Sequence, residues 1–477
     1  MRKQVIGALC IALLAGCSTA SVETETPANG TADETAVRTA VNEEAAAVSY
    51  EDVMKAAEQI GSAVAEGRWE EAAAAFSASA EGTRDAQGLK ELWDAAEHEG
   101  PYQVLEADPL FHNGHIGCTV LIQTADGTVM EVLARMNEEL RIEKMKFAER
   151  PAIAEAESAE TWTETVIYAG NAPKISGILT LPVNEETDEK TEAEEEPVLP
   201  PVAVLLGEEM DDPMNESGSN TELRRDLARS LAEHGIASVR FDSRLYENPD
   251  LADVFGYDLS LIIEEDVASI FHSVEQYPVN ARRIVCVGHG AAGTMGYSHV
   301  YHHFEVTGGL VLINAPFTED GVHLFQRAAW LDEALADEAK AAIEAEADDS
   351  AYIGNYPLSY WQQWNRMGAL LYTRFVAIPI LIQQGKEDGI VTPSSDYENW
   401  KTQKGSNVTM KLYPDIGHDL RGKDSTFEDL IAEDIADWLN GVDINKKKPE
   451  PTPTPSASPA ASASPAPSAS PSAGARS

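Results

Sequence analysis

The sequence predicts an α/β protein. Its main domain is expected to be a doubly wound, mostly parallel sheet, preceded by a small α+β domain. Hydrophobic residues make up 43% of the 477-residue chain, enough to bury sizeable cores. From residue 161 to 441, apolar runs of strand length alternate with segments of helix length. From residue 48 to 149, helical spacing comes first and strand-like alternation follows, as in an α+β layer domain.

The chain begins with two basic residues, a short apolar core and the sequence Leu14-Ala15-Gly16-Cys17. This beginning resembles the lipobox of bacterial lipoproteins, so residues 1–17 are expected to be a signal peptide and Cys17 the lipidated first residue of the mature protein. An ordinary cleaved signal peptide or a short anchor is the alternative. Because two acyl chains attach a protein stably, the resemblance implies a cell-membrane lipoprotein, bound to the lipid bilayer through Cys17 and facing the extracytoplasmic side.

Two further segments lack the residues needed for a core. Residues 18–47 are mostly Thr, Glu, Ala and Asn, which predicts a flexible linker. Residues 442–477 consist mainly of Pro, Ser and Ala after a run of three lysines, which predicts a disordered, extended tail.

The small domain, residues 48–149, is expected to start with three helices. Apolar residues from Val53 to Val64 recur at helical spacing. The stretches AEGRWEEAAAAF and LKELWDAAEHEGPYQ resemble a domain of unknown function found ahead of many secreted bacterial hydrolases. Trp69, Phe76 and Trp93 are expected in the core, with a ligand pocket as the alternative.

The main domain, residues 161–441, is expected to start with two antiparallel strands and to continue as an alternating sheet with helices on both faces. The strands are expected at residues 165–168, 177–182, 201–206, 237–241, 283–287, 309–314, 379–384 and 408–413. The clearest helices are expected at residues 223–234, 265–276 and 428–439. The acidic stretch 184–196 is expected to be a solvated insertion.

Charge and cysteine content exclude some classes of function. The net charge of −45 argues against a nucleic-acid partner, because phosphates would be repelled. Four cysteines are too few for a disulfide framework, and Cys118 and Cys286 lie in apolar runs where buried, inert thiols are expected.

The apolar run 284–287 ends in Gly288-His289-Gly290-Ala291-Ala292. A buried strand that breaks into small residues and then opens a helix is typical of the elbow that carries the nucleophile in α/β-hydrolases, where the pattern is G-x-S-x-G. Here the position of the serine is Gly290, and that pattern occurs nowhere in the chain. A residue with a Cβ is strained by about 1–3 kcal/mol in such a turn, and glycine removes the strain.

The main domain resembles the α/β-hydrolase family, in particular its secreted bacterial esterase and acylaminoacyl-peptidase-like branch. The resemblance rests on the segment 264–290 and on three further stretches, LARSLAEHGIASVRFDSR, IPILIQQGKEDGIVTP and LYPDIGHDL. The family order of nucleophile, acid and histidine implies Gly290, Asp388 and His418. Asp388 would orient the imidazole and His418 would be the general base. A turn or helix-cap aspartate and a surface-loop histidine are the alternatives.

The resemblance also implies where an oxyanion hole would lie. Its candidates are Gly207, Glu208 and Ala291. Glutamates at this place oppose a developing negative charge, and loss of one good donor costs roughly 10²–10³ in rate. Residues 320–375 fall where this family inserts a cap, and their aromatic residues imply a mostly apolar ligand.

The sequence therefore favours an esterase-like but catalytically silent protein that binds a small apolar or peptide-like ligand or an envelope partner. The alternative is an active ester or peptide hydrolase that uses Asp388 and His418 without a serine. A third interpretation is a cation site built from the acidic residues 208–212 with His289 or His418, since hard cations prefer clustered carboxylates. We expect no cofactor and no metal. The sequence leaves open the role of the first domain.

Overall fold

The computed structural model describes residues 48–112, 114–151, 155–171, 173–183, 198–207, 222–248, 250–256, 259–302, 307–317, 333–347, 351–354, 356–359, 361–362, 378–403, 405, 407–424, 426–427 and 429–442. Several predicted features lie outside these residues: Cys17 and the linker, the acidic insertion, Glu208, most of the cap and nearly all of the tail. No helix in the described part of the chain is long and apolar enough to cross a membrane.

The small domain has the predicted α+β order. Helices α2 (Tyr50–Ala65), α3 (Trp69–Ala74) and α4 (Ala86–Asp94) precede the antiparallel sheet β1 (Gln103–His112), β2 (His115–Gln123), β3 (Val129–Met136) and β4 (Ile142–Glu149). The hydroxyl of Ser49 accepts from Asp52 N and caps α2. We did not predict β1, because it contains Pro109 and lacks regular alternation. Its place at the sheet edge, paired only with β2, is one where a strand tolerates proline.

The aromatic residues of this domain form its core, as expected. Trp93 and Phe76 are buried, whereas Trp69 is only partly buried and packs against the same core. The Trp93 ring meets Tyr102 and Phe147 edge-on, at centroid distances of 5.4 and 5.3 Å. The aromatic rings therefore pack against one another in this core.

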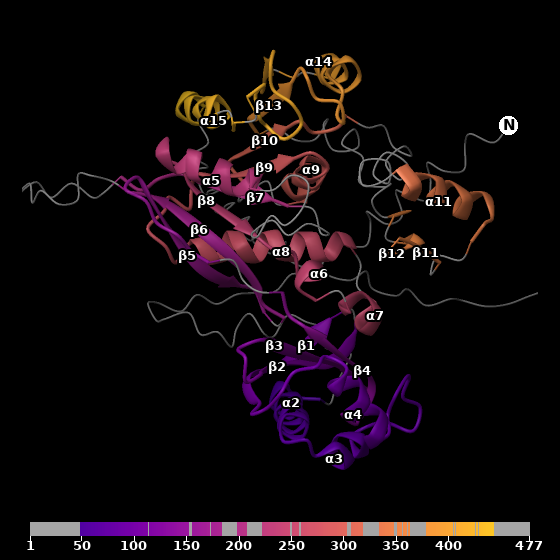
Figure 1. Cartoon of the computed structure of the whole chain (residues 1–477). Helices are drawn as coiled ribbons and strands as arrows, with labels where there is room; N and C mark the ends of the chain where they lie inside the picture. The colour runs from indigo at the N-terminus through magenta and orange to yellow at the C-terminus, as the bar shows by residue number, and fades with distance from the viewer. Residues whose placement is uncertain are drawn as a thin grey trace, which may run out of the picture. The chain divides into compact units, whose positions relative to one another are not determined.

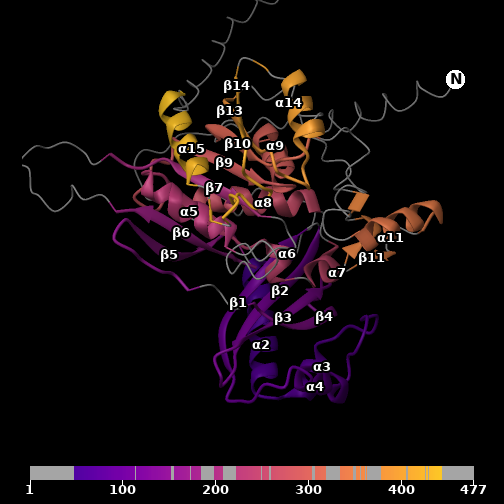
Figure 2. The same ribbon diagram turned by 45° about the horizontal axis from the view of Figure 1, so that its top comes forward.

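The main domain is a doubly wound, mostly parallel sheet with helices on both faces, which confirms the predicted α/β fold class (Figures 1 and 2). Its eight strands have the order β14-β13-β10-β9-β7-β8-β6-β5. Strands β5 and β6 are antiparallel and β6 also runs antiparallel to β8, whereas the other neighbours are parallel. The strand bounds are β5 (Trp162–Ala169), β6 (Ile175–Pro182), β7 (Val202–Leu206), β8 (Ala237–Phe241), β9 (Ile284–His289), β10 (Gly309–Ile313), β13 (Ile380–Gly385) and β14 (Val408–Tyr413).

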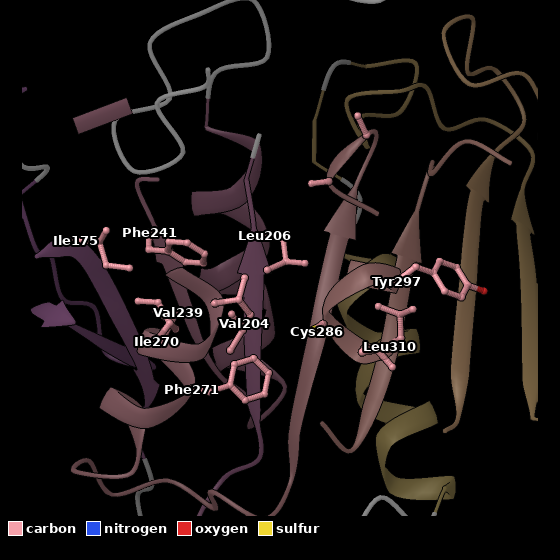
Figure 3. Packing of buried hydrophobic residues seen from close by; sticks show 14 of the residues in the cluster. Ile175, Val204, Leu206, Val239, Phe241, Ile270, Phe271, Cys286, Tyr297 and Leu310 are labelled. Carbon is pink, nitrogen blue, oxygen red and sulfur yellow. The ribbon is translucent and has the colours of Figure 1, made fainter. Parts of the chain in front are cut away.

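Helices cover both faces of this sheet. Alternate strand residues face a core with α8 (Leu259–Val274) and α9 (Ala292–His302) on one side, and a core with α5 (Leu223–Glu233) and α15 (Leu430–Gly441) on the other. Figure 3 shows Ile270 and Phe271 of α8 beside Val239 and Val204 of the sheet. A sheet buried on both faces explains why its strands read as continuous apolar runs.

The remaining elements are short, apart from α11. They are α6 (Arg244–Glu247), α7 (Leu251–Phe255), α11 (Glu333–Glu344), β11 (Tyr352–Ile353), β12 (Tyr356–Pro357), the π-helix η4 (Pro393–Tyr397) and α14 (Glu398–Gln403). Residues Ser49–Ser477 form one unit by their contacts, and α7 packs against β3 and β4. Lys144 of β4 lies 2.7 Å from Asp253, and Arg135 of β3 donates to Val254 O.

Candidate active site

The elbow predicted around Gly290 is present. Strand β9 ends at His289 and α9 begins at Ala292, so two residues make the whole turn. Gly290 has φ of +57°, in the left-handed region that favours glycine. Its N–H donates to Ile313 O at 3.0 Å and its carbonyl accepts from Gly293 N at 3.1 Å. The turn therefore has the backbone of a nucleophile elbow with no side chain at its tip.

The predicted acid and base lie together at the ends of two neighbouring strands. Asp388 follows β13 and His418 follows β14. The distance from His418 Nδ1 to Asp388 Oδ2 is 2.9 Å, and the side chains are 15% and 0% exposed respectively. The other carboxylate oxygen accepts from Ile390 N and Val391 N at 2.8 and 2.9 Å. Because both oxygens are engaged, the carboxylate is fixed and orients the imidazole ring.

Asn314, directly after β10, connects the acid loop to the histidine loop. Its Nδ2 donates to Gly417 O and His418 O, both at 3.0 Å. Its Oδ1 accepts from Gly385 N at 2.7 Å and from Gln384 Nε2 at 3.1 Å. This role of Asn314 was not predicted from the sequence. A polar residue at the end of an apolar strand was the available signal, but its partners are 70 or more residues away along the chain.

A second histidine lies against the first. The ring centroids of His289 and His418 are 4.6 Å apart, and His289 Nε2 is 2.7 Å from His418 O. Desolvation by burial, reinforced by His418 nearby, lowers the pKa of His289 well below its usual value. A carbonyl oxygen only accepts, so the neutral His289 carries its proton on Nε2.

The described residues supply no replacement nucleophile. Among them, no hydroxyl or thiol lies within hydrogen-bonding distance of the His418 ring. Thr294 and Ser298 fall on α9, as expected, and Thr294 is buried. Cys286 and Cys118 are free and buried, and burial raises the pKa of both thiols. A thiol that resists ionisation is a poor nucleophile.

Two of the three oxyanion-hole candidates, Gly207 and Ala291, lie within the described residues. Leu206 pairs with Gly288, which brings Gly207 beside the elbow. Ala291 is only 3% exposed. Within the described ranges, no acceptor lies within hydrogen-bonding distance of the Ala291 or Gly207 N–H groups. A buried backbone N–H without an acceptor is rare in folded proteins, so the Ala291 N–H is a candidate hydrogen-bond donor to a ligand.

The cation interpretation gains no support from this part of the chain. Across the residues that the structure describes, no three His, Cys, Asp or Glu side chains are grouped so as to hold a metal ion. The acidic stretch 208–212 lies outside them.

Comparison with known proteins gives similarity to solved structures only. No family model and no curated protein matches the chain. Hypothetical protein PA2218 from Pseudomonas aeruginosa is 15% identical, with 62% of this chain and 99% of that chain covered and a TM-score of 0.42. The esterase domain of a Rhodothermus marinus protein is 16% identical over 58% and 98% of the two chains (TM-score 0.38). Pyrococcus horikoshii acylaminoacyl peptidase is 14% identical over 74% and 57% (TM-score 0.39). Similarity at this level assigns no activity to the chain.

Proposed function

We propose that this chain is a catalytically silent, esterase-like protein that uses a hydrolase fold to bind a ligand. The observation that carries the proposal is the glycine at position 290, at φ of +57°, beside an intact pair of Asp388 and His418. Acyl transfer by this fold needs a side-chain nucleophile at the elbow, activated by the histidine. Here the base has no hydroxyl or thiol to deprotonate among the described residues.

The ligand in this proposal is a small apolar or peptide-like molecule, or a partner in the cell envelope. The lipobox resemblance at Cys17 supports a membrane-anchored protein that faces the extracytoplasmic side. The aromatic residues between 320 and 375 support an apolar ligand.

One observation favours a second candidate, an ester or peptide hydrolase without a serine. The distance of 2.9 Å between His418 and a fully buried Asp388 is what activation of a water molecule by this pair would need. Serine hydrolases that have lost a triad member keep about 10³–10⁴-fold catalysis over water.

Hydrolysis of an activated ester, p-nitrophenyl butyrate, separates the two candidates. We expect the purified full-length chain to show no burst and no turnover above the buffer rate. Gly290→Ser places a hydroxyl at the elbow tip, and we expect it to restore measurable turnover. Gly290→Ala is the matched control, because it adds the same backbone strain without the oxygen.

Two outcomes would contradict the proposal. Turnover by the unchanged chain that disappears in His418→Ala would establish the second candidate instead. Equal rates for the Gly290→Ser and Gly290→Ala variants would show that a side chain introduced at position 290 does not reach His418. The glycine at that position would then not explain the absence of activity. His272→Ala, which changes an 83% exposed histidine, controls for nonspecific catalysis by surface imidazole.

A further inference from the structure

The loss of the nucleophile changes which chemical group fits the elbow best. In an active enzyme the serine oxygen occupies the space between the elbow tip and the base. At Gly290 that space holds no side-chain atom of the residue itself, while the backbone and His418 remain in place. A ligand oxygen can therefore take the place that the serine oxygen would occupy.

The elbow side of this space is lined by hydrogen-bond donors. The N–H groups of Ala291 and Gly207 have no acceptor among the described residues, and Ala291 is buried. Helix α9, which is 11 residues long, starts immediately after Ala291 and directs the positive end of its dipole to the same place. An oxygen that carries negative charge is favoured here over a neutral one.

His418 provides a proton acceptor on the opposite side. Its Nδ1 is directed to Asp388, and no group of the described residues lies within hydrogen-bonding distance of its Nε2. With the Nδ1 proton donated to the carboxylate, Nε2 has a free lone pair. His289, packed against this ring, stays neutral and adds no positive charge beside it.

From this arrangement we infer that the ligand binds through a carboxylic acid group. The acid transfers its proton to His418 Nε2: the O–H bond breaks, an N–H bond forms, and no electrons are exchanged. One carboxylate oxygen then accepts from the new N–H at the place of the missing serine oxygen. The other accepts from the Ala291 and Gly207 N–H groups.

An ester fits this arrangement less well, and a primary amide offers Nε2 only a neutral N–H donor in place of a charge-assisted hydrogen bond. A carboxylic acid supplies a proton and two acceptor oxygens, whereas an ester has no proton to give and leaves Nε2 without a partner. Because the acid enters with its proton, the site gains no net charge, which matters in a chain with a net charge of −45. This inference rests on the proposed binding function and specifies the chemical class of the ligand.

Calorimetry with hexanoic acid, hexanamide and methyl hexanoate on the full-length chain tests the inference. We expect the acid to bind and the amide and ester of the same length to bind at least about tenfold more weakly, since a hydrogen bond to a charged group is worth more than a neutral one. In HEPES and Tris, whose ionisation enthalpies differ, the heats of binding should differ, because the carboxylate is ionised at about pH 8 and the proton it binds with is then taken up from the buffer.

Variants locate the binding group. We expect His418→Ala to weaken hexanoate binding by roughly tenfold to a hundredfold. Gly290→Ala should also weaken hexanoate binding, because the added methyl group would occupy the position of the ligand oxygen. His272→Ala is the control on an exposed histidine and should leave binding unchanged.

The outcomes separate this inference from the proposed function. Equal affinity for acid, amide and ester, binding that survives His418→Ala, or absence of binding at millimolar hexanoate would overturn the carboxylic-acid inference. Each of these results leaves a silent hydrolase fold intact as long as the unchanged chain does not cleave esters. Ester cleavage that depends on His418 would overturn the proposed function itself.

Discussion

Replacing Asn314 by alanine tests whether one side chain holds the acid and histidine loops together. Asn314 is fully buried and makes four hydrogen bonds of 2.7 to 3.1 Å through its amide group. The substitution removes all four and leaves the buried Gly385 N–H without an acceptor. An unsatisfied buried donor costs about 1–3 kcal/mol, and each lost neutral bond about 0.5–1.5 kcal/mol.

The backbone adds to this cost. Asn314 has φ of +47°, which asparagine tolerates better than alanine. The two effects together predict a loss of about 3–5 kcal/mol in the free energy of unfolding. Asn314→Gly relieves the backbone strain without restoring the bonds, so we expect it to be about 1 kcal/mol more stable than Asn314→Ala.

Urea unfolding measures the loss, and hydrogen exchange shows where it acts. We expect faster amide exchange at residues 417–420 in Asn314→Ala, because the carbonyls of that loop lose their donor. Asn137→Ala is the control: its side chain accepts from Glu139 N and Arg141 N in an exposed turn, and we expect a change of about 1 kcal/mol or less. A loss below about 1 kcal/mol for Asn314→Ala, or unchanged exchange in the histidine loop, would refute the reasoning.

Three further predictions concern the elbow, a buried carboxylate and the lipid anchor. A Cβ at Gly288 would lie 2.6 Å from Gly293 Cα, so Gly288→Ala should lower the unfolding free energy by roughly 1–3 kcal/mol, whereas Gly389→Ala, with nothing within 4 Å, should change it little. Equal effects in the two variants would argue against close packing at the elbow. Burial raises the pKa of Asp266 to about 6 from 3.8, despite the nearby Arg244. Between about pH 4 and about pH 6, the Asp266 carboxyl is therefore protonated in the folded chain and ionised in the unfolded chain. The free energy of unfolding should fall by about 3 kcal/mol as pH rises through this range. Asp266→Asn should flatten that fall in urea titrations, and an unchanged pH slope would contradict the shift. Cys17→Ser should move the chain from the membrane fraction to the soluble fraction in cell fractionation, unless the anchor is an ordinary apolar segment.

The sequence by itself determined the fold class and the sites along the chain where chemistry would be sought. Apolar runs that alternate with helical segments specified a parallel sheet, because burial on both faces leaves that pattern in the residues. The turn at Gly290 could be identified from glycines and small residues alone, since a tight strand-to-helix turn accepts few others. The edge strand β1 escaped prediction because edge pairing does not require regular alternation.

Only the tertiary structure decided how these positions meet. Asp388 and His418 were candidates by order along the chain, but their distance of 2.9 Å depends on the pairing of β13 with β14 and on the loop contacts through Asn314. The contact of the His289 ring with the His418 ring and the free N–H groups beside the elbow depend in the same way on loops from different strands. Sequence patterns record whether a residue is buried, whereas the partners of a loop residue are set by the strands that carry the loops.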